Sequence, residues 1–287
     1  EIMPSLVGSE MCIRDRELTM LDRVTRNSPN GRTLAVFDLD KTIIDTSASM
    51  AYRRPLARQG LLSTREVLRM LTLLGSYMFT THTDEDMDAT KDALTSMIKG
   101  RDAATMRAVA QDALQEVITP YIYAEARELL DHHRQQGHDI AIVTASVSVL
   151  VEPIFHELGA DHLIASELEE VDGTFTGQLI HYNKGQTKVD RLRALAADHN
   201  YDLDASYAYT DSISDLPLLE SVGNPRPVNP DRQLRKIALE RDWPVQRFVR
   251  PEPLFPQAAV LAGAGATVAI LGAITAGMAV WLQSRKD

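Results

Sequence analysis

Cysteine and positive charge are both scarce in this 287-residue sequence, and each shortage excludes a class of protein. The single cysteine, Cys12, excludes an internal disulfide framework and a zinc site built from cysteines. Lysine and arginine number 30 against 40 acidic residues, a formal net charge of −10. Because a dedicated nucleic-acid-binding protein normally carries a basic surface, we expect no nucleic-acid partner. The histidines are scattered without an HExxH-type pattern, so we interpret most of them as surface residues and expect no histidine metal site.

The rest of the composition is that of a globular protein, with 44% hydrophobic and 24% charged residues. The length allows one large domain or two modest ones. Residues 1–19 lack the basic start and the apolar stretch of a secretory signal. Within them, Glu10–Arg16 resembles the translation of a sequencing adapter. We therefore interpret residues 1–19 as a non-native or disordered leader.

A long uncharged run extends from Ala258 to Leu282. As a helix it would measure about 37 Å at ~1.5 Å per residue, enough to cross a hydrocarbon core of roughly 30 Å. We therefore predict that residues 251–287 form a linker and a single-pass transmembrane tail anchor, with the main domain on the cytoplasmic face. The alternatives are a buried core helix and a helix lying at the membrane interface.

Between these ends, strands separated by helices predict an α/β fold with a Rossmann-like parallel sheet. The clearest predicted strands are Thr33–Phe37, Asp139–Val143 and Tyr207–Thr210. Residues 46–118 interrupt the alternation, because they are predicted to be almost wholly helical. We assign residues 20–45 and 119–250 to the core and residues 46–118 to an inserted small helical cap.

Three polar residues, Asp38, Thr144 and Asp211, each directly follow one of these predicted strands. Because parallel sheets bind ligands at the carboxyl ends of their strands, we expect the three to converge. Asp40 lies two residues after Asp38, and two carboxylates so close repel unless a cation or a proton lies between them. A carboxylate can also be a nucleophile, so the pattern favours attack by Asp38 and proton transfer by Asp40.

The segments around these residues resemble the motifs of the haloacid dehalogenase superfamily of phosphatases and phosphotransferases. The first, second and fourth motifs are matched by Asp38-Leu39-Asp40-Lys41-Thr42, by Thr144, and by Asp211 with Asp215. The helical insert between the first two motifs is similar to the small-cap subgroup, subfamily IB, which includes phosphoserine phosphatase. The third motif is a lysine after Gly-x-x, which favours Lys188 and leaves Lys184 as the alternative.

The resemblance implies Mg²⁺-dependent hydrolysis of a phosphomonoester through an aspartyl-phosphate. Asp38 would attack the phosphorus, while Asp40 would protonate the leaving alkoxide and then activate water. The residues implied to bind magnesium are Asp38, Asp40 through its main-chain carbonyl, Asp211 and Asp215 in support. Those implied to hold the phosphoryl oxygens are Thr144, Ala145 through its main chain, and Lys188. Ser146 is interpreted as a cap of the following helix rather than a phosphate contact.

The substrate is expected to be a small or lipid-linked phosphate ester. Phosphoserine is disfavoured, since Ser47 stands where phosphoserine phosphatases carry a glutamate for the substrate amine. Lys91–Ile98 also offers no arginine for the substrate carboxylate. Two alternatives are a non-catalytic, membrane-anchored regulatory protein on the same fold and a phosphotransferase with an acceptor other than water. The sequence leaves the oligomeric state open.

Overall fold

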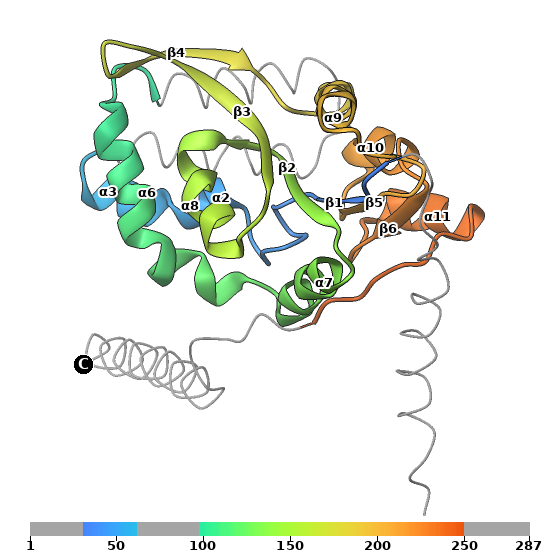
Figure 1. Ribbon diagram of the computed structural model, residues 1–287. Helices are drawn as coiled ribbons and strands as arrows, with labels where there is room; N and C mark the ends of the chain where they lie inside the picture. Colours follow the sequence, from blue (N-terminus) through green and yellow to red (C-terminus); the bar gives the residue numbers. More distant parts are fainter. Residues whose placement is uncertain (1–30, 62–97, 250–287) are drawn as a thin grey trace, which may run out of the picture.

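The structure is a computed structural model that describes residues 31–61 and 98–249 (Figure 1). These residues form a six-stranded sheet in the order β4-β3-β2-β1-β5-β6. Its strands are β1 (Leu34–Phe37), β2 (Asp139–Val147), β3 (His162–Val171), β4 (Thr174–His181), β5 (Tyr207–Thr210) and β6 (Asn224–Pro227). Neighbouring strands are parallel except β3 and β4, which form an antiparallel hairpin. The predicted α/β fold with a mainly parallel sheet is confirmed.

Helices cover both faces of this sheet (Figure 1). One face is covered by α7 (Ala124–Gln135) and α8 (Ser148–Leu158). Farther out on that side lie α2 (Ala48–Ala51), α3 (Arg53–Arg58) and α6 (Ala103–Val117), of which α2 and α6 pack against α8. The other face is covered by α9 (Gln186–His199), α10 (Leu216–Glu220) and α11 (Arg232–Glu240). Two 3-10 turns, η1 (Thr119–Tyr121) and η2 (Ile213–Asp215), precede α7 and α10.

Strand β1 lies in the middle of the sheet and is buried on both faces. Its side chains alternate: Ala35 and Phe37 join the cluster under α7 and α8. Leu34 and Val36 join the cluster under α9, α10 and α11. All four residues are fully buried, as expected for a strand whose sequence is continuously hydrophobic. The rigid strand therefore fixes the position of Asp38, the residue that follows it.

Several element boundaries agree with the sequence pattern, and others differ for identifiable reasons. Helix α8 ends before Gly159, which has a left-handed φ of 60°. Helix α7 begins only at Ala124, because Tyr123 is extended and donates its main-chain N–H to the carbonyl of Ile43. The segment Asn224–Pro227 contains two prolines and is not among the clearest strands predicted from the sequence, yet it forms β6. Prolines are tolerated there because β6 is an edge strand, where a missing N–H costs no ladder hydrogen bond.

Some predictions fall on residues that the structure does not describe. The leader, residues 62–97 of the cap and the uncharged run near the C-terminus all lie outside the described residues. The parts of the cap segment that are described, α2, α3 and α6, are helical. Within 31–61 and 98–249, none of the helices has the length and apolar character needed to cross a bilayer. The cap as a unit and the tail anchor stay predictions.

Candidate active site

Among the predicted site residues, Asp38 follows β1 directly, and Thr144 and Ala145 lie in the last half of β2. Phe37, the last residue of β1, pairs with Ile142 of β2 on one side and Tyr209 of β5 on the other. Asp38 continues the second pairing by donating its main-chain N–H to the carbonyl of Tyr209 at 2.9 Å. Asp211 directly follows β5. Asp38 therefore lies between its two neighbouring strands, near the point where β5 leads into Asp211.

A buried lysine joins two of the carboxylates. The Nζ atom of Lys188, on the first turn of α9, lies 2.7 Å from Oδ1 of Asp38 and 2.7 Å from Oδ2 of Asp215. Burial lowers the pKa of Lys188, but attraction by the two carboxylates more than offsets this, so its pKa is raised overall. The lysine therefore stays charged. Of the two candidates, Lys188 is the one that the structure brings into contact with Asp38, in line with the Gly-x-x-Lys pattern.

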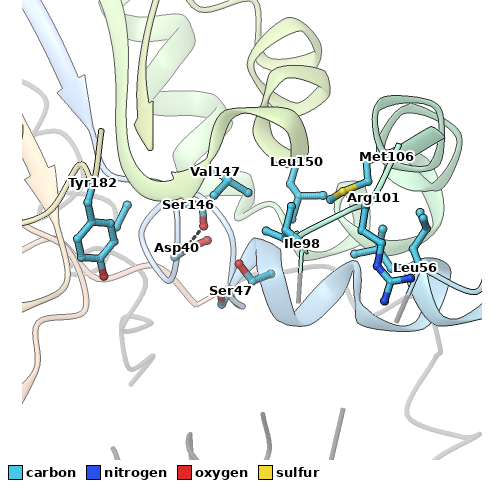
Figure 2. Close-up of a pocket in the computed structure, with 13 residues that line it drawn as sticks. Asp40, Ser47, Leu56, Ile98, Arg101, Met106, Ser146, Val147, Leu150 and Tyr182 are labelled. Carbon is cyan, nitrogen blue, oxygen red and sulfur yellow. Dashed lines mark hydrogen bonds between the residues drawn. The ribbon is translucent and has the colours of Figure 1, made fainter. Parts of the chain in front are cut away.

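Asp40 has a different environment, because its carboxylate is bound by neutral donors (Figure 2). Its Oδ1 accepts the main-chain N–H of Ala48 at 2.8 Å, and its Oδ2 accepts the hydroxyl of Ser146 at 2.7 Å. Burial raises the pKa of Asp40, and the two hydrogen bonds oppose that shift. A buried carboxyl group with a raised pKa is suited to carry a proton.

The interpretation of Ser146 as a helix cap is wrong. Strand β2 continues through Val147, so Val147 is the N-cap residue of α8, and no side chain caps that helix. The Ser146 hydroxyl is directed at Asp40 instead. The pattern of a serine before an apolar helix does not distinguish these two roles, since the exact residue at which the strand ends decides between them.

Thr144 and Ala145 lie where the pairing of β2 with β3 becomes irregular, between Val143 and Val147. The Thr144 side chain is fully buried, and its Oγ1 accepts the main-chain N–H of Ser146 at 3.1 Å. The carbonyl of Ala145 accepts the hydroxyl of Ser166 at 2.7 Å. The main chain around Thr144 and Ala145 is therefore held by hydrogen bonds to side chains rather than by regular pairing of β2 with β3.

Asn183 also holds the main chain around Thr144, and the sequence analysis does not identify it. Its Nδ2 atom donates to the carbonyls of Thr144 at 2.8 Å and Ile164 at 2.9 Å, which bridges β2 and β3 where they separate. Its main-chain N–H donates to the Ser166 hydroxyl at 3.0 Å. Its Oδ1 is buried, with no hydrogen-bond partner within the part of the chain that the structure describes. No local sequence signal identifies this role, because the register of the two strands creates it.

Acidic groups outnumber basic groups at this edge of the sheet. Burial raises the pKa of Asp38 to about 8, and its neighbours Asp215, Asp40 and Asp211 add to the shift while Lys188 opposes it. Burial likewise raises the pKa of Asp211 to about 7, with Lys41 opposing the shift and Asp215 adding to it. One buried ammonium thus faces several carboxyl groups, and a bound divalent cation would favour their ionised form.

The donor set fits magnesium by its chemistry. The ligands that the resemblance implies are oxygen atoms only, from the Asp38 and Asp211 carboxylates and the Asp40 carbonyl, and Mg²⁺ prefers such ligands together with water. Within 31–61 and 98–249 there is no group of three or more His, Cys, Asp or Glu side chains arranged to hold a metal. The implied set does not require one, because it uses two carboxylates and a main-chain carbonyl. Support of the magnesium by Asp215 stays a prediction. In the structure, the Oδ2 atom of Asp215 accepts hydrogen bonds from Lys188 and Thr210 instead.

One histidine departs from the expected surface location. His133 of α7 is buried, and its Nε2 lies 2.9 Å from the Tyr209 hydroxyl. Burial lowers the pKa of His133 to about 3, so the ring is neutral. It packs edge-on against Phe37, whose ring stacks on Tyr209. His132 and His133 are adjacent in a polar stretch of α7, so the sequence alone does not reveal that His133 faces the core.

Comparison with known proteins agrees with the motifs and the fold. Residues 35–220 match the family of haloacid dehalogenase-like hydrolases. The chain belongs to this family, as the sequence motifs predicted.

Individual relatives cover most of the chain. A protein of Mycobacterium tuberculosis called a probable phosphatase is 40% identical over 90% of this chain and 91% of its own length. A phosphoserine phosphatase of the same organism is 31% identical over 83% of this chain and 79% of its own length. A solved structure from Bordetella pertussis, described as a protein with unknown function, has a TM-score of 0.67. It is 30% identical, covering 75% of this chain and 98% of that one. The prediction of an enzyme of this hydrolase family, similar to phosphoserine phosphatase, is confirmed.

Proposed function

We propose that this protein is a Mg²⁺-dependent phosphatase that hydrolyses phosphate monoesters through an aspartyl-phosphate on Asp38. The observation that carries the proposal is the contrast between two neighbouring carboxylates. Asp38 is paired with the ammonium of Lys188, whereas Asp40 is held by a main-chain N–H and a hydroxyl. The first arrangement suits a nucleophile that meets an anionic group, and the second suits a group that carries a proton.

In the first step, an Asp38 oxygen would form a bond to phosphorus while the bond to the ester oxygen breaks. Asp40 would give its proton to the leaving oxygen, so that an alcohol departs. In the second step, Asp40 would take a proton from water, and the water oxygen would attack the same phosphorus. The bond between phosphorus and Asp38 then breaks, releasing inorganic phosphate and restoring the carboxylate.

The remaining site residues would stabilise negative charge during both steps. Lys188 would share its ammonium between Asp38 and the phosphoryl oxygens, and Asp215 would hold that ammonium in place. The Thr144 hydroxyl and the main-chain N–H of Ala145 would bind the phosphoryl oxygens. Magnesium would be held by Asp38, the Asp40 carbonyl and Asp211, with Asp215 nearby. When bound, it would neutralise charge on the attacking carboxylate and the phosphoryl group.

The names of the relatives support a phosphatase, since they include a probable phosphatase and a phosphoserine phosphatase. For this chain we propose a small or lipid-linked phosphate ester as substrate, because Ser47 leaves no carboxylate at the position expected to hold an amine. We also propose that the uncharged run near the C-terminus anchors the protein in a membrane, with the catalytic domain on the cytoplasmic side.

The test is a phosphate-ester screen of the full chain with and without Mg²⁺. Asp38→Asn should lower turnover by on the order of 10⁴ or more, since it removes the nucleophile. Asp112→Asn, an exposed aspartate on α6, is the matched control and should leave turnover unchanged. After a brief reaction, native protein should also carry a hydroxylamine-sensitive phosphate on Asp38. Full turnover by Asp38→Asn, or the absence of Mg²⁺-dependent turnover of any ester, would refute the proposal.

A further inference from the structure

A cavity of about 180 Å³ opens beside Asp40, between the start of α8 and helices α3 and α6 (Figure 2). Its wall is mainly apolar, formed by Leu56, Leu61, Ile98, Met106, Val147 and Leu150. All of these except Leu61 are buried, and they pack within the hydrophobic cluster of that face of the sheet. The wall is therefore held by the core of the protein rather than by an exposed loop.

The polar groups of the cavity lie at its two ends. In Figure 2, Asp40, Ser146 and Ser47 lie together, with Tyr182 on their other side, and the apolar side chains extend away from them toward Arg101. Among the described residues that line the cavity, Asp40 and Arg101 are the charged ones. A substrate ammonium group in this cavity would lose its bound water, and Asp40 is the one carboxylate among the described lining residues that could replace that water. Burying such a group therefore costs free energy.

The position of the cavity beside Asp40 relates it to the alcohol part of the substrate. In the proposed function, Asp40 gives its proton to the ester oxygen, so the departing alcohol must lie on the Asp40 side of the phosphorus. That side opens onto the apolar wall, which begins at Val147, directly after Ser146.

We propose that this cavity binds the departing alcohol and selects phosphate monoesters of short apolar alcohols. The inference rests on the proposed function and narrows its substrate class. The size is sufficient, because an apolar cavity of about 150 Å³ is known to hold a benzene molecule. The volume therefore matches a short alkyl or phenyl group.

The first measurement is kcat/KM for methyl, ethyl, propyl and butyl phosphate, with phenyl phosphate and phosphoserine for comparison. Each added methylene should raise kcat/KM about fourfold, which corresponds to ~0.8 kcal/mol per buried CH₂. Phosphoserine should be a poorer substrate than propyl phosphate, which has a similar length. Equal kcat/KM across the alkyl series, or preference for phosphoserine, would overturn the assignment. Turnover confined to phosphatidate in vesicles would do so too.

A binding measurement separates this inference from the proposed function. The dissociation constants of methyl to butyl phosphonate, which cannot be hydrolysed, should fall with chain length in native protein. If no ester is turned over and this trend persists, the proposed chemistry fails while the apolar site stands. A flat series would refute the site itself.

A pair of variants on α6 locates the effect. Met106→Gln places an amide in the apolar wall and should reduce the gain per methylene to less than twofold for both esters and phosphonates. Ala104→Gln introduces the same side chain at an exposed position of the same helix and should keep the native trend. Methyl phosphate should be turned over equally by both variants, which shows that they are folded. An unaltered trend in Met106→Gln would contradict the proposed site.

Discussion

The two sides of the Asp38 carboxylate differ in how charge is balanced. On the charge-paired side, formed by Asp38, Asp215 and Lys188, two carboxylates share one buried ammonium. On the neutral side, Asp40 is held by the N–H of Ala48 and the hydroxyl of Ser146 and adjoins an apolar cavity. A phosphate monoester has the same division, with an anionic phosphoryl group and an uncharged alcohol. The difference suggests which end of the substrate each side receives.

Removal of magnesium should have the largest effect, because it acts on the side with excess negative charge. Chelation with EDTA should reduce turnover to background, and added Mg²⁺ should restore it. Since a ligand that binds only the folded protein stabilises it, Mg²⁺ should also raise the Tm, and less so in Asp211→Asn. Turnover that persists in EDTA would contradict the magnesium assignment.

Asp40→Asn tests the neutral side. The loss in kcat/KM, which reports the step in which the alcohol departs, should reach about 10³ for alkyl phosphates, because their departing alkoxide needs a proton. The loss in kcat/KM should be much smaller for p-nitrophenyl phosphate, whose departing phenolate is stable without a proton. Steady-state kinetics with the two esters make this comparison in one variant. Equal losses in kcat/KM for both esters would show that Asp40 does not protonate the leaving group.

Lys188→Met should lower turnover by about 10² to 10³ and also destabilise the fold. Its removal leaves two buried carboxylates uncompensated, a situation that typically costs about 3–5 kcal/mol. Urea denaturation measures that cost. Lys184→Met, four residues earlier, is the control and should affect stability far less.

A second substitution keeps this test informative if Lys188→Met folds poorly. Lys188→Met with Asp215→Asn removes one of the two uncompensated charges and should recover part of the lost stability. If stability recovers but turnover does not, the Lys188 ammonium is needed both to balance buried charge in the fold and for the reaction. No recovery would indicate that Lys188 stabilises the fold by packing instead.

Ser146→Ala should have the smallest effect. Loss of one hydrogen bond to Asp40 is worth about 0.5–1.5 kcal/mol, so kcat/KM should fall by a few-fold to tenfold. The loss should again be larger for alkyl phosphates than for p-nitrophenyl phosphate, because it acts through Asp40. Ser148→Ala, the first residue of α8, is a nearby control. A larger loss than that of Asp40→Asn would require a separate role for Ser146.

The parts of the site that the sequence predicted depend on local pattern. Asp38 and Asp211 follow apolar strands directly, so the position of each carboxylate could be inferred from its own segment. The roles of Ser146 and Asn183 could not be inferred in this way. They arise because β2 extends to Val147 and separates from β3, and this depends on pairing between distant segments. The strand at Asn224–Pro227 was missed for a related reason, since only its edge position makes its prolines acceptable.

The β3–β4 hairpin has a consequence for how this protein can change over evolutionary time. Its tip pairs with the chain before α6: the N–H of Gly100 donates to the carbonyl of Phe175 at 2.8 Å, and that of Ala103 to Gly173 at 2.9 Å. In return, the N–H of Phe175 donates to the carbonyl of Arg101 at 3.0 Å. These bonds join main chain to main chain, so they do not depend on which side chains this segment carries. These bonds hold the path of the chain directly after Ile98, so a conservative exchange at this buried residue is expected to reshape the cavity wall before it moves the backbone.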